Sequence, residues 1–138
     1  TGEYSGYYTD DSGKKKLLFK YNKLYTEEYG PKFGLTVDFH MSSFNFENQF
    51  MSEYLVDPDY FADIMRTKCN MKLIDTDTFE NQFELFRHWF NNVAPYEANP
   101  KTNKYFKDVE KFYDFTDSEN KASFEFSKLH RYYVFQKI

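Results

Sequence analysis

The sequence predicts a mixed α/β fold with at most one domain, because strand-like and helix-like hydrophobic patterns alternate along 138 residues. Between Phe33 and His40, apolar and polar residues alternate with the period of two that marks a half-buried strand. After Asp57, apolar residues recur at helical spacing. The run from 131 to 136 is rich in aromatic residues and predicts a closing strand.

Glycine usage and charge exclude several function classes. All five glycines lie within the first 34 residues, so no glycine-rich phosphate loop or dinucleotide turn can follow Gly34. The net charge of −4 argues against a nucleic-acid footprint spread over the whole chain. No apolar run approaches the roughly 18 residues of a membrane span, so we expect no membrane partner.

Aromatic residues make up 22% of the chain, with 17 Phe and 13 Tyr. Two interpretations remain open: the amino-acid usage of an AT-rich genome, or a dedicated stacking surface. A single cysteine, Cys69, excludes an internal disulfide and fits a reducing compartment.

The first half of the chain predicts strands. Residues 1–16 are expected to form a mobile entry segment with a turn over residues 10–13. The lysine run 14–16 is interpreted as a solvated strand entrance, with a phosphate patch as the alternative. Further strands are expected over 17–21, 33–40 and 53–56, with a turn at Asn22-Lys23 and a loop over 42–48.

Two helices and a strand follow. Asp57 is a good N-cap, Pro58 suits the first helical position, and Asn70 can close this helix. Residues 71–74 predict a strand. A second helix is expected to start at Asp77, with Glu80 completing a capping-box-like arrangement. Its stripe of aromatic residues is assigned to the core: Phe79, Phe83, Phe86 and Phe90, with Trp89 alongside.

The last third predicts less regular structure. Pro95 and Pro100 are expected to bracket a surface connection, and residues 105–113 form a shorter amphipathic segment. Residues 114–121 are polar and rich in turn formers, so we expect a loop there. The three histidines are too far apart, without cysteine companions, to predict a zinc site, and Cys69 is interpreted as a passive thiol.

Four short motifs, taken in order, resemble the C-terminal half of eukaryotic and viral mRNA cap guanine-N7 methyltransferases. They are Tyr29-Gly30-Pro31-Lys32-Phe33-Gly34 with Val37-Asp38-Phe39, Glu53-Tyr54-Leu55-Val56, Asn70-Met71-Lys72-Leu73, and Tyr132-Tyr133-Val134-Phe135. The Asp57-Pro58 step and the wealth of Asn, Lys and Phe favour a large DNA virus as the source.

The resemblance implies that residues 1–138 are part of a class I (Rossmann-like) methyltransferase fold ending in an antiparallel strand pair, 71–74 with 132–136. The family binds S-adenosylmethionine through an Asp-x-Gly-x-Gly segment that does not occur here. We therefore expect the methyl donor to be bound mainly by an absent half of the domain. This segment alone is expected to be inactive.

The resemblance also implies a guanine site. Glu53 matches the glutamate that recognises the cap guanine, and Tyr132 matches the aromatic residue that packs against it. If the last strand is shifted by two residues, His130 takes the place of Tyr132, because alternate side chains share a face. The competing interpretations are a solvated carboxylate for Glu53 and a core position for Tyr132. Tyr54 and Tyr133 are expected to be core residues.

The implied partners are the capped or guanylylated 5′ end of RNA, the remainder of a capping-enzyme chain, and a stimulatory subunit. A viral protein of this kind is expected in the cytoplasm, in virus factories or virions, and a cellular one in the nucleus. Two other functions stay open: a non-catalytic, methyltransferase-like accessory subunit, and a structural or interaction domain.

Overall fold

The computed structural model describes residues 2–25, 34–43, 45–92 and 103–138. They form two compact units. The first, called here the sheet unit, comprises Thr1–Thr76 and Tyr133–Ile138, and the second, the helical unit, comprises Asp77–Tyr132. No shift in composition at either boundary predicted this division. The expected connection around Pro95 and Pro100, and the motif residues Tyr29 to Phe33, lie outside the described residues.

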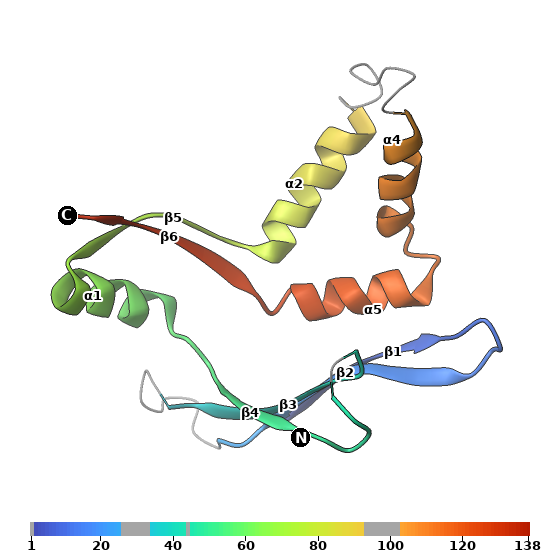
Figure 1. The fold of residues 1–138 in the computed structure, drawn as a ribbon, viewed down its shortest axis with the longest axis horizontal. Coiled ribbons are helices and arrows are strands. Elements are labelled where there is room, and N and C mark those ends of the chain that lie inside the picture. Colours follow the sequence, from blue (N-terminus) through green and yellow to red (C-terminus); the bar gives the residue numbers. More distant parts are fainter. Residues whose placement is uncertain (1, 26–33, 44, 93–102) are drawn as a thin grey trace. The chain divides into compact units, whose positions relative to one another are not determined.

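A four-stranded antiparallel sheet forms the first part of the sheet unit (Figure 1), with the strands in sequence order. Its strands are β1 (Glu3–Thr9), β2 (Lys15–Lys23), β3 (Thr36–Met41) and β4 (Met51–Tyr54). The predicted alternation over 33–40 is confirmed at Val37 and Phe39, which are buried, but His40 on the opposite face is buried as well. Asn22 and Lys23 do not form the expected turn; they continue β2 and pair with β1 and β3.

The prediction of a mobile entry segment over residues 1–16 is wrong. Residues 3–9 form β1, which pairs with the whole of β2 from Thr9 opposite Lys15 to Glu3 opposite Asn22. The turn predicted at residues 10–13 is confirmed, and it joins the two strands as a hairpin. Gly13 takes a φ of 80°, a conformation that glycine adopts without strain.

The two faces of this sheet differ in character, because directly opposed residues on antiparallel strands share a face. The aromatic face carries Tyr4, Phe19, Tyr21, Val37, Phe39, Met51 and Glu53. The polar face carries Lys20, Asn22, Asp38, His40 and Ser52. Phe19 is completely buried, which makes the aromatic face the core of the sheet.

Gly6 is required where β1 crosses the Phe19 ring. A Cβ atom at this position would lie 2.3 Å from Cε1 of Phe19, far inside van der Waals contact. We expect Gly6→Ala to lower the free energy of unfolding of the sheet by about 1–3 kcal/mol, as overpacking does in cores. Amide hydrogen exchange in β1 and β2 measures this. Ser5→Ala, on the opposite face, serves as the control, and unchanged protection in Gly6→Ala would contradict the close packing.

Asp10 organises the hairpin turn. Its Oδ1 accepts hydrogen bonds from the backbone N–H groups of Ser12 and Lys14, both at 3.0 Å, and from the Ser12 hydroxyl at 2.6 Å. The Ser12 hydroxyl and the Lys14 amide stabilise the ionised form and lower the pKa of Asp10 from 3.8 to about 2.

This pKa predicts how the hairpin responds to acid. Because the folded pKa lies below the unfolded one, the stabilisation is complete above about pH 4 and is lost as the pH falls toward 2. An NMR titration of the Asp10 carboxyl group is expected to show a midpoint near 2. Asp10→Asn keeps an acceptor oxygen, so its hairpin should not respond over this range. A wild-type midpoint near 4 would contradict the turn geometry.

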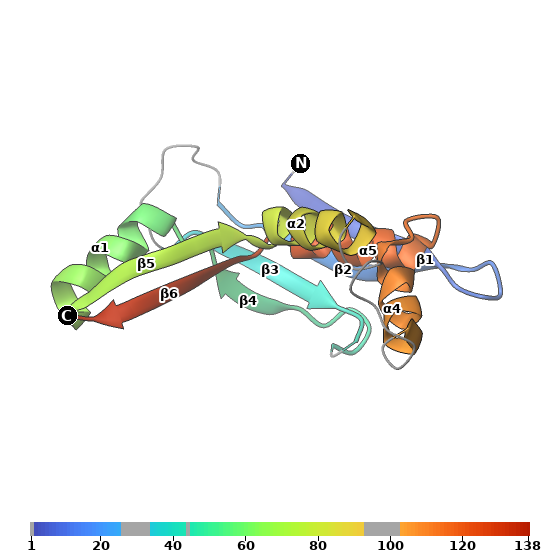
Figure 2. The same ribbon diagram turned by 90° about the horizontal axis from the view of Figure 1, so that it is seen from above.

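The second part of the sheet unit follows the predicted signals closely. Helix α1 (Pro58–Cys69) begins after Asp57, whose side chain accepts from the Tyr60 amide at 2.8 Å, and ends at Asn70 in the left-handed conformation. Strand β5 (Met71–Thr78) pairs with β6 (Arg131–Lys137), and Figure 2 shows the two running in opposite directions. Phe61 of α1 packs edge-on against Tyr133 and Phe135 of β6, with ring centroids 5.0 and 5.4 Å apart.

The fold is mixed α/β and includes a terminal strand pair, as expected, and its four-stranded sheet is antiparallel throughout. The class I (Rossmann-like) assignment stays a prediction. The pair is not a simple hairpin, since residues 79–130 separate its strands. Each helix in the described part of the chain is too short or too polar to cross a lipid bilayer.

The helical unit contains α2 (Phe79–Asn92), α4 (Asn103–Glu110), the short 3-10 helix η1 (Lys111–Tyr113) and α5 (Ser118–Ser127). Helix α5 corrects the expectation of a loop over 114–121. Asp117 caps it by accepting from the backbone amides of Glu119 and Asn120. The capping box at Asp77 is also wrong by one residue, because the Thr78 hydroxyl accepts from the Asn81 amide at 3.2 Å.

The aromatic stripe of α2 is only partly core. Phe83 lies 4.5 Å from the Phe124 ring and 5.7 Å from the Phe115 ring, measured between centroids, and Phe90 contacts Phe106 and Tyr113. By contrast, three members predicted to be core are exposed: Phe79, Phe86 and Trp89. The physical reason is that helices α4 and α5 cover only part of the stripe's width.

Candidate functional site

Glu53 lies on β4 with its side chain exposed, on the aromatic face of the sheet. Its backbone pairs with Val37 of β3, so strand pairing and not a loop fixes its position. The neighbouring residue Asp38 points to the opposite face, where it accepts a hydrogen bond from Ser52 at 2.9 Å. Glu53 is therefore the acidic member of the described aromatic face.

Two aromatic rings lie beside Glu53 on this face. Tyr21 and Phe39 are directly opposed across β2 and β3, and their rings stack with centroids 4.6 Å apart and planes inclined by 26°. Burial, together with the negative charge of Glu53, raises the pKa of Tyr21 to about 12. The Tyr21 phenol therefore stays protonated at neutral pH. The effect of the Glu53 charge on this pKa shows that the Glu53 carboxylate lies close to the Tyr21 side chain.

The contribution of Tyr21 was not predicted from the sequence. Residues 17–21 were recognised as a strand, but the neighbour of Glu53 depends on the register of β2, β3 and β4. Alternate residues of a strand share a face, and this rule relates Tyr21 to Glu53 once the strand register is known. Tyr21, Phe39 and Met51 form one row across the sheet, and Lys23, Val37 and Glu53 form the next row on the same face. Phe39 is buried and Tyr21 half-buried, so their rings support the strand that carries Glu53, and the exposed carboxylate is the group that can accept hydrogen bonds from a ligand.

Tyr132 and His130 lie at the other end of the chain. Tyr132 is half-buried in β6, and His130 immediately precedes that strand. The His130 ring lies 4.5 Å from the Phe126 ring and 5.9 Å from the Phe79 ring, between centroids, and its Nδ1 atom lies 3.1 Å from the Phe126 carbonyl oxygen. His130 thus already packs within the helical unit.

Glu53 belongs to the sheet unit, whereas Tyr132 and His130 belong to the helical unit. That Glu53 and either Tyr132 or His130 contact the cap guanine stays a prediction. Of the two tyrosines assigned to the core, Tyr133 is half-buried against Phe61, but Tyr54 is 68% exposed. Tyr54 was misassigned because it belongs to the polar face, opposite Thr36.

The Asp-x-Gly-x-Gly segment through which the resembled family binds its methyl donor does not occur in this sequence. Of the two described glycines with a positive φ, Gly13 serves the turn after Asp10. That the methyl donor is bound mainly by an absent half of the domain stays a prediction.

The chain is similar to a segment of the probable mRNA-capping enzyme of Acanthamoeba polyphaga mimivirus. The two are 29% identical over 143 residues, which cover 96% of this chain. The chain spans 12% of the length of that relative. No protein-family model matches the chain, and no solved structure matches it. The similarity confirms the predicted resemblance to a viral capping enzyme, and the methyltransferase part of that resemblance stays a prediction.

Proposed function

We propose that the chain is the cap-guanine-binding segment of a viral mRNA cap guanine-N7 methyltransferase, within a longer capping polypeptide. The observation that carries the proposal is the Glu53 carboxylate beside the stacked rings of Tyr21 and Phe39. The similarity to the mimivirus capping enzyme supports it, as do the motifs shared with the methyltransferase family.

The chemistry of Glu53 suits guanine. An ionised carboxylate can accept two parallel, charge-assisted hydrogen bonds from guanine N1–H and the N2 amino group. Adenine presents an acceptor at N1 and no N2 amino group, so it would leave the carboxylate unpaired. A site of this kind rejects the wrong base through polar groups left without partners.

Tyr132 is the second residue of the proposed site. Packing of an aromatic ring against a base is worth about 1–3 kcal/mol. His130 stays the alternative to Tyr132, and its ring lies 4.5 Å from the Phe126 ring and 5.9 Å from the Phe79 ring, measured between centroids.

Methylation at guanine N7 uses the lone pair of that ring nitrogen, so no general base is needed. The residues of this chain would act by orienting the guanine, and good orientation of two reactants can supply about 7–11 kcal/mol. Because the Asp-x-Gly-x-Gly segment does not occur in this sequence, we propose that S-adenosylmethionine is bound mainly by the remainder of the polypeptide. This segment alone would then be inactive.

The proposed partners follow from this role. They are the guanylylated 5′ end of RNA, the remainder of the capping polypeptide, and a stimulatory subunit that completes the domain. Cytoplasmic virus factories or virions are the proposed location.

The test is methyl transfer by the complete polypeptide that contains this chain. Labelled S-adenosylmethionine and RNA with an unmethylated guanosine cap are expected to yield a cap methylated at N7, identified after nuclease digestion. RNA with an adenosine in place of the cap guanosine should give no product. Guanosine-cap binding without methyl transfer would favour an accessory subunit, and absence of both would refute the proposal.

A further inference from the structure

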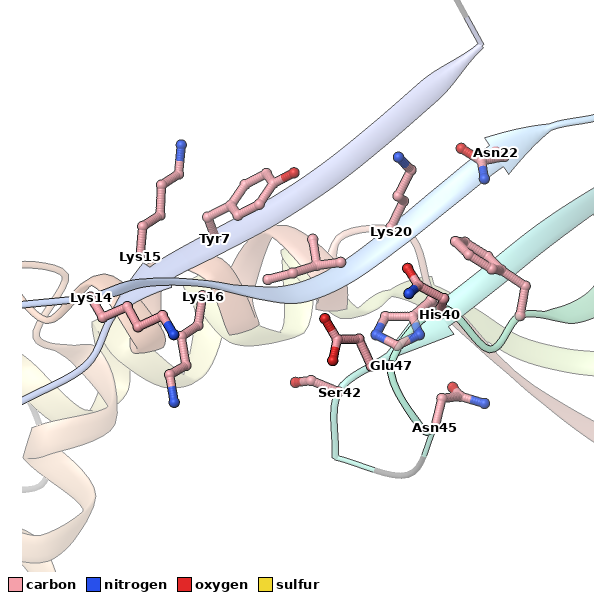
Figure 3. Close-up of a pocket in the computed structure, with 13 residues that line it drawn as sticks. Tyr7, Lys14, Lys15, Lys16, Lys20, Asn22, His40, Ser42, Asn45 and Glu47 are labelled. Carbon is pink, nitrogen blue, oxygen red and sulfur yellow. The ribbon is translucent and has the colours of Figure 1, made fainter.

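A second candidate site lies in the sheet unit, among residues that the proposed guanine site does not use. A pocket of about 800 Å³ opens between the β1–β2 hairpin and the loop that joins β3 to β4 (Figure 3). We call it the lysine pocket. It is lined by Tyr7, Lys14, Lys15, Lys16, Leu17, Lys20, Asn22, His40, Ser42, Asn45, Glu47, Asn48 and Phe50.

The pocket exists because β2 is longer than its neighbour β3. Strand β1 pairs with β2 along its length, but β3 pairs only with the part from Phe19 to Lys23. Next to this shorter pairing, the β3–β4 loop begins, with the Ser42 amide donating to the Leu18 carbonyl at 3.0 Å. From Lys14 to Lys20 the extended chain covers about 20 Å at ~3.3 Å per residue, so the lysines are spread along a line.

Four lysines and one glutamate line this pocket, in a chain whose net charge is −4. Figure 3 shows Lys15 and Lys20 extending to one side of β2, with Tyr7, and Lys14 and Lys16 extending to the other. Positive charge is therefore presented on both sides of this end of the strand. The lining of this pocket therefore has a local excess of positive charge in a chain whose net charge is negative.

The four ammonium groups are held in different ways. Lys16 pairs with Asp10 at 3.3 Å and Lys20 with Glu3 at 2.9 Å, and in each pair one side chain is exposed and the other half-buried. Ion pairs near the surface contribute little to stability and are screened by salt. The Lys15 ammonium lies 4.5 Å from the centre of the Tyr7 ring, and Lys14 has no carboxylate partner in the described part of the chain.

Aromatic and amide groups accompany the lysines. Tyr7 is 44% exposed and Phe50 is 39% exposed, so both offer ring surface to a ligand. The ring of His40, at the floor of the pocket, lies 5.6 Å from the Phe50 ring, and its Nδ1 atom lies 2.7 Å from the Gln49 carbonyl oxygen. A carbonyl can only accept, so Nδ1 carries the proton. The side-chain amides of three asparagines complete the lining: Asn22, Asn45 and Asn48.

We propose that the lysine pocket binds single-stranded RNA, with lysines on its phosphates and bases against Tyr7 and Phe50. Cations spread along a strand and accompanied by exposed rings are the combination that binds single strands without reading sequence. A compact anion would need its cations converging on one point instead. The choice of RNA as the single-stranded nucleic acid rests on the proposed function, in which the chain binds the 5′ end of a transcript.

Binding of an uncapped oligouridylate of about 12 nucleotides to the full 138-residue chain tests this directly, by fluorescence anisotropy. The Lys14→Gln/Lys15→Gln/Lys16→Gln variant is expected to bind at least tenfold more weakly at 0.1 M salt, roughly in line with the loss of three phosphate contacts. The slope of log K against log salt should become less steep by about 2.

The matched control removes three lysines elsewhere: Lys104→Gln/Lys107→Gln/Lys121→Gln, in the helical unit. It has the same net charge and should bind like wild type. Equal weakening in both triple variants, or no binding by wild type, would overturn the proposal. Circular dichroism of each variant checks that the fold is kept.

Two further measurements distinguish binding of single-stranded RNA from binding of other anions. Tyr7→Phe should bind like wild type, whereas Tyr7→Ala should lose about tenfold through the missing ring. Inorganic triphosphate at equal phosphate concentration should compete poorly, and full competition would reassign the pocket to compact anions and overturn the RNA assignment. Because the oligouridylate carries no cap, RNA binding can succeed when cap methylation fails, so the two proposals fail separately.

Discussion

We expect Glu53→Gln to lower kcat/KM for cap methylation by the complete polypeptide by about 100-fold, which corresponds to roughly 3 kcal/mol. Replacing one carboxylate oxygen with an NH2 group turns an acceptor into a donor that faces a donor of guanine. The affected N–H is left without a partner, and a lost hydrogen bond to a charged group costs about 1.5–3 kcal/mol. The substitution preserves the shape of the side chain, so strand β4 should be unaffected.

Asp38→Asn is the matched control for Glu53→Gln. Asp38 lies in the adjacent row of the same sheet but on the polar face, where it bonds to Ser52, and an amide oxygen can still accept that bond. We expect this variant to keep wild-type activity. If Asp38→Asn lost as much activity as Glu53→Gln, the effect would lie in the sheet and not in guanine recognition.

A cap in which inosine replaces guanosine provides an independent check on Glu53. Inosine lacks the N2 amino group, so wild type should lose about tenfold or more on this substrate because one of its two hydrogen bonds is absent. The Glu53→Gln variant should discriminate less between the two caps, since the two changes remove parts of the same interaction. Equal discrimination by both proteins would refute the assignment of Glu53.

Local signals in the sequence predicted α1 almost residue for residue. Asp57, Pro58 and Asn70 act within one turn of the helix ends, so neighbouring residues alone determine where the helix begins and ends. The alternation that predicted β3 is local in the same sense. The pairing of β5 with β6 is not local, and it was predicted only through the family resemblance.

Helix α5 was missed because its sequence does not carry a helical pattern. Its apolar residues Ala122, Phe124 and Phe126 alternate, which is the period of a strand, and its first turn is polar. The helix is defined by its cap at Asp117 and by packing of Phe124 on Phe83 and Phe115. The contact between Phe83 and Phe124 joins residues far apart in the sequence, so no local pattern reveals it, whereas the Asp117 cap is local and was not recognised.

In the candidate sites, too, local sequence predicted some residues, whereas their neighbours depend on how distant segments pack. Glu53 was found from a motif, but its ring neighbours Tyr21 and Phe39 depend on strand register. Lys14 to Lys16 were interpreted as a solvated strand entrance, and Lys15 and Lys16 do lie at the start of β2. That they line a pocket with His40 and Phe50 follows from the β3–β4 loop, 25 or more residues away.

Phe83→Ala is expected to have the largest effect on the stability of the helical unit. The Phe83 ring contacts the rings of Tyr113, Phe115 and Phe124, with centroid distances between 4.5 and 5.7 Å, and so joins α2 to η1 and α5. The Arg87 guanidinium carbon lies 5.9 Å from the centres of the Phe83 and Phe115 rings. Deleting a ring of this kind costs about 3 kcal/mol, through lost contacts and the cavity left behind.

The fluorescence of Trp89 can measure the stability of the helical unit separately from that of the sheet unit. It is the only tryptophan of the chain and lies on α2, so its fluorescence during urea unfolding reports on the helical unit. Phe86→Ala is the matched control, because Phe86 lies on the same helix but is 58% exposed, and it should cost less than about 1 kcal/mol. Phe83→Leu keeps part of the apolar volume and should fall between the two. Since the three variants differ in how many ring contacts they retain, their order separates packing at Phe83 from any general effect on helix α2. Equal midpoints for Phe83→Ala and Phe86→Ala would show that the aromatic cluster does not hold the unit together.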